Sequence, residues 1–222
     1  MNLKSKLRGL NNVLLKLLKI PILPSDSYLA GGTALYFYLH HRLSVDLDFF
    51  TQKDFIPEML VFKLREKFGT VDVEIMEKES LIAFLSPEKI KFSFFSLPYP
   101  LLSSLKILEL SNEATCSAAS LDDIAAMKAI AISQRGSAKD FVDLYHIIRH
   151  TQIKFEDLSS FVQKKYQLEK KYEYHMKTAM VYFDDADREF DSIMIVQNKE
   201  HFRQLSESEW KKIKDFFFSF IR

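Results

Sequence analysis

The 222-residue chain is poor in the residues that define several protein classes. Its one cysteine, Cys116, excludes an intramolecular disulfide framework and a cysteine-based zinc cluster. Its charges almost cancel, with 31 Lys and Arg against 30 Asp and Glu, so no strong overall field favours nucleic acid. No apolar run approaches the roughly 20 residues that span a bilayer. We therefore expect a globular protein of a reducing cytoplasm, with no membrane partner.

The first 20 residues carry leucines at helical spacing. Asn11, Asn12 and Lys16 interrupt any hydrophobic region of a secretory signal. A helix lying on a membrane surface is the less favoured alternative. We expect a packed first helix that Pro21 and Pro24 end.

Glycine is also scarce, yet two of the five glycines, Gly31 and Gly32, are adjacent. Adjacent glycines indicate a backbone requirement, either a positive φ or the close approach of a ligand. The segment Thr33–His41 contains neither Gly nor Pro and fits a short helix that opens after them. A Gly-Gly-Thr sequence at a helix N-terminus offers N–H groups, the positive end of the helix dipole and the Thr33 hydroxyl, which suits a phosphate.

The segment Val45–Phe50 alternates acidic and apolar residues, as a half-buried strand does. The alternation predicts that Asp46 and Asp48 share one face, with Cα atoms roughly 6.6 Å apart. Two carboxylates at that spacing are able to share Mg²⁺, which usually binds together with a nucleotide phosphate. An isolated Asp-x-Asp is more often a solvated strand face. The order of glycines, helix and carboxylates favours a phosphoryl- or nucleotidyl-transfer site.

Two blocks of the sequence resemble a known family. The first runs from Gly31-Gly32-Thr33-Ala34-Leu35 to His41-Arg42 and Asp46-Leu47-Asp48-Phe49-Phe50. The second comprises Asp123-Ile124-Ala125-Ala126-Met127-Lys128, then Arg135 and Lys139-Asp140-x-x-Asp143-Leu144-Tyr145. Both are similar to the signature of the AbiEii/AbiGii-type nucleotidyltransferase-like toxins of bacterial type IV toxin–antitoxin and abortive-infection systems.

This resemblance implies an α+β fold, with a DNA polymerase β-like nucleotidyltransferase domain and a C-terminal helical half. It implies an enzyme that uses Mg²⁺ (or Mn²⁺) and an NTP, with metal on Asp46 and Asp48 and phosphates on Gly31, Gly32 and Thr33. The acceptor is a tRNA 3′ end or a protein, and an antitoxin is expected to be encoded nearby. A non-catalytic binding module that keeps the fold and acts through a partner is the alternative.

Further site residues follow from the second block. Lys128, Arg135 and Lys139 would form a cationic clamp for a triphosphate on one continuous helix, unless Gly136 and Ser137 break that helix. Asp140 would orient Lys128 or Arg135, or act as a base. Asp143 would pair with Lys139. Arg42 would reach the nucleotide site, neutralise the two acidic residues or form a structural bridge.

One position departs from the pattern that the resemblance implies. Nucleotidyltransferases of this fold often hold a third carboxylate on a later strand, and the aligned position here is Ser93. The serine indicates either a two-carboxylate magnesium site or weakened activity. Asp72 and Glu74 on the preceding strand are possible substitutes, although a solvent-facing hairpin is the favoured interpretation.

The order of elements predicts an α/β domain over residues 1–110 and a helical domain over 111–222 that closes a nucleotide cleft. Besides the elements above, the α/β domain is expected to contain one helix and three strands, and its link to the helical domain spans Ser103–Ser117. From Ser120 onward we expect helices, apart from a loop at Asp184–Arg188. The helix and strands are Pro57–Lys67, Val71–Met76, Leu81–Leu85 and Ile90–Leu97.

Overall fold

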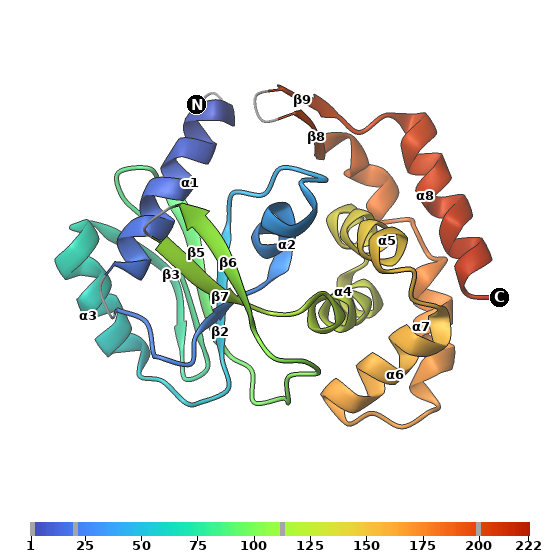
Figure 1. Ribbon diagram of the computed structural model, residues 1–222, viewed down its shortest axis with the longest axis horizontal. Coiled ribbons are helices and arrows are strands. Elements are labelled where there is room, and N and C mark those ends of the chain that lie inside the picture. The colour runs from blue at the N-terminus through green and yellow to red at the C-terminus, as the bar shows by residue number, and fades with distance from the viewer. Residues whose placement is uncertain (1–2, 20–21, 112–113, 199–200) are drawn as a thin grey trace. The chain divides into compact units, whose positions relative to one another are not determined.

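The computed structural model describes residues 3–19, 22–111, 114–198 and 201–222, and the chain divides into two compact units (Figure 1). Unit 1 comprises Met1–Ala34, Ser44–Tyr99 and Leu105–Ala119, and unit 2 comprises Leu35–Leu43, Pro100–Ser104 and Ser120–Arg222. The division differs from the predicted boundary at residue 110, because strands up to residue 118 belong to the sheet of unit 1. A cleft between the predicted domains stays a prediction.

Unit 1 is built on a mixed seven-stranded sheet with the order β3-β4-β5-β2-β1-β7-β6. Strand β2 pairs in parallel with β5, and β1 pairs in parallel with β7, whereas the other neighbours are antiparallel. The strands are β1 (Tyr28–Leu29), β2 (Leu47–Thr51), β3 (Val71–Glu77), β4 (Ser80–Leu85), β5 (Ile90–Ser96), β6 (Lys106–Ser111) and β7 (Ala114–Ala118).

The two faces of this sheet differ, because successive side chains of a strand point to opposite sides. In β2, Leu47 and Phe49 are buried, whereas Asp48 and Phe50 are half-buried. Helix α1 (Leu3–Leu18) packs against β5 and β7, and helix α3 (Pro57–Phe68) packs against β3 and β4. The half-buried face is therefore the one that carries the acidic residue.

Unit 2 is mainly helical and has an aromatic core in which Phe141, Phe183 and Phe217 pack together with Trp210. Its elements are the helices α4 (Leu121–Arg135), α5 (Ala138–Thr151), α6 (Phe155–Tyr166), α7 (Tyr172–Met180) and α8 (Glu207–Phe220), the 3-10 helices η1 (Ala186–Arg188) and η2 (Phe190–Ser192), and the strands β8 (Met194–Asn198) and β9 (His201–Gln204).

Sequence signals set the ends of helix α4. At its start the Ser120 hydroxyl accepts a hydrogen bond from the Asp123 N–H at 3.1 Å, as an N-cap serine does. At its end Gly136 adopts a left-handed φ of 58°, and α5 begins two residues later. Gly136 and Ser137 therefore break the helix, and a single helix through residues 128–139 is wrong.

Several other element predictions need correction. The predicted link Ser103–Ser117 contains β6 and β7, which extend the sheet of unit 1. The C-terminal region is not wholly helical, since β8 and β9 form a hairpin whose Ile195 bridges to Arg42. Pro21, which we expect to end the first helix, lies outside the described residues, and α1 ends at Leu18.

The predicted helix at Thr33–His41 is present two residues earlier, as α2 (Gly31–Leu39). Its first residues belong to unit 1 and the rest to unit 2. Among the described helices, none combines the length and the apolar character that crossing a membrane requires.

Candidate active site

The adjacent glycines stand at the beginning of α2, beside the strand that carries the acidic residues. The Ala30 N–H donates to the Asp48 carbonyl at 3.0 Å, which joins the start of the helix to β2. Gly31 has a φ of +65°, and a Cβ atom built on it would lie 2.8 Å from Oδ2 of Asp48. Of the two expected reasons for glycine, the structure shows the left-handed backbone, and it adds the close approach of the chain's own Asp48 carboxylate.

The Thr33 hydroxyl has partners within unit 1. It is buried, donates to the backbone carbonyl of Asp46 and lies 3.0 Å from the Ser44 hydroxyl oxygen. These contacts hold the loop before β2 against the helix. The hydroxyl thus positions Asp46, and the backbone N–H of Thr33 is the group that suits the predicted phosphate.

The sheet register places Ser93, the position that we aligned with a third carboxylate, directly beside Asp48. Asp48 on β2 is paired with Ser93 on β5, and Ser93 is buried. Asp46 lies just before β2, in the loop that Thr33 holds. Asp72 and Glu74 are exposed on the edge strand β3, three strands from β2. At about 4.8 Å per strand they are too far away to replace a ligand beside Asp48, so the hairpin interpretation is correct.

The donor set in unit 1 fits magnesium better than a metal that needs a protein cage. Among the described residues, no group of three or more His, Cys, Asp or Glu side chains is placed to hold a metal ion. Mg²⁺ commonly takes one or two carboxylates and completes its shell with water and substrate phosphates. Asp46 and Asp48 supply that number of carboxylates, and the Asp48 carboxylate lies at the start of α2.

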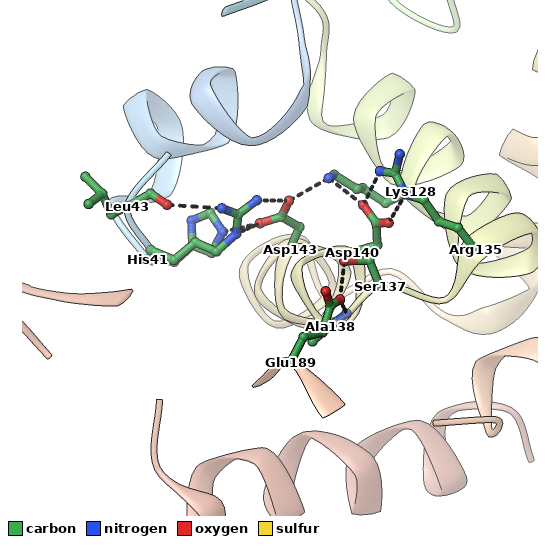
Figure 2. A network of polar contacts seen from close by, with 10 residues as sticks. His41, Leu43, Lys128, Arg135, Ser137, Ala138, Asp140, Asp143 and Glu189 are labelled. Carbon is green, nitrogen blue, oxygen red and sulfur yellow. Dashed lines mark hydrogen bonds and ion pairs between the residues drawn. The ribbon is translucent and has the colours of Figure 1, made fainter. Parts of the chain in front are cut away.

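Unit 2 contains a second group of predicted site residues, joined in one ion-pair network (Figure 2). The Lys128 ammonium lies 2.8 Å from Oδ1 of Asp140 and 2.7 Å from Oδ2 of Asp143. Both aspartates are fully buried, and Asp140 and Asp143 lie three residues apart on one face of α5. The expected pair between Asp143 and Lys139 is replaced by these contacts, and Lys139 is exposed.

Arg42 and His41 extend the network from the end of α2. Arg42 binds Asp143 through two parallel contacts, Nε to Oδ1 at 2.6 Å and Nη2 to Oδ2 at 2.7 Å. His41 Nε2 lies 2.7 Å from the same Oδ1 atom. Of the roles predicted for Arg42, the structure shows the structural bridge, with Asp143 as its partner.

Arg135 completes the network at the end of α4. Its Nε donates to Oδ2 of Asp140 at 2.8 Å and its Nη2 to Oδ1 at 3.1 Å. Its side chain is nevertheless 66% exposed. Three cations face two carboxylates, so the network keeps one excess positive charge when His41 is neutral.

Burial and pairing both act on the pKa values of this network. Burial raises the pKa of Asp143, but Arg42 and Lys128 outweigh it and hold that pKa well below the usual range. The pKa of Asp140 is likewise lowered, because Lys128 and Arg135 outweigh burial. Burial lowers the pKa of Lys128, but the two carboxylates raise it by more, so the pKa lies above its usual value. The network is therefore ionised at neutral pH.

Two histidines beside the network remain neutral. Burial lowers the pKa of His41 despite its hydrogen bond to Asp143. The His146 ring lies 5.0 Å from the His41 ring, centroid to centroid, and burial lowers its pKa to about 4.

Sequence reasoning missed two members of the network and a residue that caps its helix. His41 and Asp143 belong to the two sequence blocks, yet nothing local predicts that residues 102 positions apart meet. Glu189 accepts from the Ser137 hydroxyl at 2.5 Å and from the Ala138 N–H at 2.7 Å, and so caps the helix that carries both aspartates (Figure 2). The sequence offers no signal for this long-range cap.

Known structures share this fold. MenT4, a nucleotidyltransferase toxin from Mycobacterium tuberculosis H37Rv, matches with a TM-score of 0.56 and 16% identity, over 98% of this chain and 82% of that one. A proposed nucleotidyltransferase from H. pylori matches with a TM-score of 0.56 and 16% identity, over 96% of this chain and 94% of that one. The predicted fold class is therefore confirmed.

Sequence relatives carry the assignment further. An uncharacterised protein of Aquifex aeolicus (strain VF5) is 37% identical over 195 residues, which cover 87% of this chain and 85% of that protein. The family model described as nucleotidyl transferase AbiEii toxin of a type IV toxin–antitoxin system matches residues 13–221. Because this match spans almost the whole chain, the protein belongs to the AbiEii family and is a nucleotidyltransferase.

Proposed function

We propose that this protein transfers a nucleoside monophosphate from an NTP to an acceptor hydroxyl, in a reaction that depends on Mg²⁺ (or Mn²⁺). The acceptor is an RNA, such as a tRNA, or a protein. The transfer makes the chain a toxin in the cytoplasm of a bacterium, and a neighbouring gene encodes the antitoxin. The toxin family supports this role.

The chain's own groups in unit 1 would bind the triphosphate. The first N–H groups of α2, at Gly31, Gly32 and Thr33, have no partner within the helix and lie at the positive end of its dipole. They suit the phosphate oxygens. Asp46 and Asp48 would hold the metal, which when bound neutralises charge that develops on the phosphates.

One observation carries this proposal. The missing side chain of Gly31 lets the Asp48 carboxylate approach the helix start so closely that even one methyl group would meet Oδ2 at 2.8 Å. This close approach supports an anion site and a cation site next to each other, as a metal–triphosphate complex requires. A turn glycine alone would not need this close approach.

Unit 2 would contribute positive charge. The network has one excess cation, and the exposed Arg135 and Lys139 are the cationic groups most accessible to an anion. Two carboxylates already contact the Lys128 ammonium. In its predicted role, the ammonium would bind the triphosphate and these carboxylates at the same time. For Asp140, the low pKa and two cationic partners favour the orienting role over that of a general base.

Transfer of label tests the function directly. The protein is incubated with each α-labelled NTP, Mg²⁺ and either total RNA or total protein, and the label in each polymer is measured. We expect label in one polymer from the wild type, and background from Asp48→Asn or with EDTA. Absence of transfer by the folded wild type to both polymers contradicts the proposal.

Ser93 supports the second candidate function, a binding module that acts through a partner, because it stands where a third carboxylate would face Asp48. Growth after induced expression separates the two. An enzyme loses toxicity in Asp48→Ala, whereas a binding module keeps it. Undiminished growth arrest by a folded Asp48→Ala protein would favour the module.

A further inference from the structure

The half-buried face of the unit 1 sheet carries an aromatic pair next to the proposed metal ligands. Phe50 comes two residues after Asp48 on β2 and therefore lies on the same face. Phe95 comes two residues after Ser93 on β5, and the register pairs Phe50 with Phe95. The aromatic row thus directly follows the row of Asp48 and Ser93.

A third ring supports this pair from the neighbouring strand. Tyr28 on β1 is the register partner of Phe50, and their stacked ring centroids lie 5.9 Å apart with an interplanar angle of 24°. The Phe50 and Phe95 centroids lie 5.5 Å apart. Tyr28 is only 1% exposed, whereas Phe50 and Phe95 are half-buried. A buried ring therefore fixes the orientation of two partly accessible ones.

The other phenylalanines of the same strands have a different role. Phe49, Phe92 and Phe94 lie on the opposite face and are at most 1% exposed, so they form the core of unit 1. Core packing accounts for these three rings. It does not account for two large rings that remain partly accessible beside a carboxylate.

We propose that Phe50 and Phe95 form a platform on which a nucleobase stacks. This inference rests on the proposed function and specifies what lies beside its metal site. Phe50 comes two residues after Asp48, which is roughly 6.8 Å along the strand. A ribose spans about this distance between a bound phosphate and its base. Aromatic rings stack with every base, so the platform accepts the base of the NTP or that of an RNA acceptor.

Calorimetric titration of Phe95→Leu and Phe95→Tyr tests the platform. Each protein is titrated with the four NTPs, with inorganic tripolyphosphate and with a short single-stranded RNA, all in Mg²⁺. We expect Phe95→Leu to weaken binding of an NTP or of the RNA by about fivefold or more, and Phe95→Tyr to restore it. Tripolyphosphate has no base, so its affinity stays unchanged. Phe62→Leu, at an exposed phenylalanine of α3, is the matched control and changes nothing.

The outcomes assign the base or overturn the platform. A loss for NTP alone assigns the base to the nucleotide, and a loss for RNA alone assigns it to the acceptor. Unchanged binding of both by Phe95→Leu overturns the platform and leaves the proposed function standing. An equal loss for tripolyphosphate also overturns it, because the ring then only supports the fold. A wild type that binds neither NTP nor tripolyphosphate contradicts the proposed function itself.

Discussion

The two groups of candidate site residues hold their charges in opposite ways. In unit 1 the half-buried Asp48 carboxylate lies against a helix start, where Gly31 leaves space for it, and Thr33 binds the backbone of the half-buried Asp46. In unit 2 three cations and two buried aspartates satisfy one another through contacts of 2.6–3.1 Å. The first group is suited to take up a metal and an anion, whereas the second stabilises the fold of unit 2.

This difference predicts different consequences of substitution. Removal of a buried charge from the network should destabilise unit 2, because a buried charge that loses its partner is costly. A change at the helix start should impair binding and leave the fold largely intact. Stability and binding therefore need to be measured side by side.

We expect the largest effect from Asp143→Asn. The change leaves Arg42 and Lys128 buried without the carboxylate that both contact, at a cost of about 3–5 kcal/mol. Urea unfolding monitored by Trp210 fluorescence measures this loss, because the chain's single tryptophan lies in the core of unit 2. Glu156→Gln, at an exposed residue of α6, is the control. A loss of less than 1 kcal/mol would show that the network contributes little to stability.

Acid should destabilise unit 2 before it affects the carboxylates. The unfolded chain protonates His146 near pH 6.5, whereas the folded protein does so only near pH 4. Between these values the unfolded state binds the extra proton, so stability falls as the pH falls. The expected loss from pH 7 to pH 5 is about 2 kcal/mol. The same fluorescence assay at both pH values should show a smaller loss in His146→Leu, and an unchanged pH dependence would contradict the assignment.

Gly31→Ala and Gly69→Ala separate backbone strain from the crowding of Asp48. Both glycines have a positive φ, so each alanine should cost about 1–2 kcal/mol. Only at Gly31 would the new Cβ meet a carboxylate, whereas Gly69 has no neighbour within 4 Å. The Asp48 side chain is able to move, so the extra effect should appear in binding of Mg²⁺ and NTP. Equal binding by the two variants would show that Gly31 serves only as a turn.

Ser93→Asp should give the smallest effect once Mg²⁺ is bound. Without metal, a third acid opposite Asp48 at this buried position is unpaired and costs several kcal/mol. Added Mg²⁺ should remove this cost, so the variant's thermal midpoint should respond more to Mg²⁺ than that of the wild type. The same response in both proteins would show that position 93 does not face the metal.

The predictable part of the site is the part that is local in sequence. The glycines and Asp48 are 17 positions apart or fewer, and one helix and one strand bring them together. The spacing therefore identified the region, and the alternation of β2 predicted which face carries Asp48. The contact of Thr33 with the Asp46 carbonyl depends on the path of a loop, which has no periodic signal.

The network was only partly within reach of local reasoning. The sequence predicts that Asp140 orients Lys128 or Arg135, and Asp140 contacts both. A lysine pattern does not reveal that Asp143 on the next helix also binds Lys128. The short strand β1 and the pair β6 and β7 were missed for a related reason. A two-residue strand has no alternation to detect, and β7 is recognisable only through its pairing with β1.

Unit 2 is assembled from three separate stretches of the chain. Asp143 depends on Arg42, which leaves the ribosome about a hundred residues before it, and the buried Lys165 donates to the carbonyl of Pro100 at 3.2 Å. A fragment that starts at residue 120 would bury Asp143 without its arginine. During synthesis, the residues of the cationic network thus become complete only after unit 1 has been made. The network therefore gains its full set of charges only when Asp143 has been made, and a product of the 3′ half of the gene alone would lack Arg42.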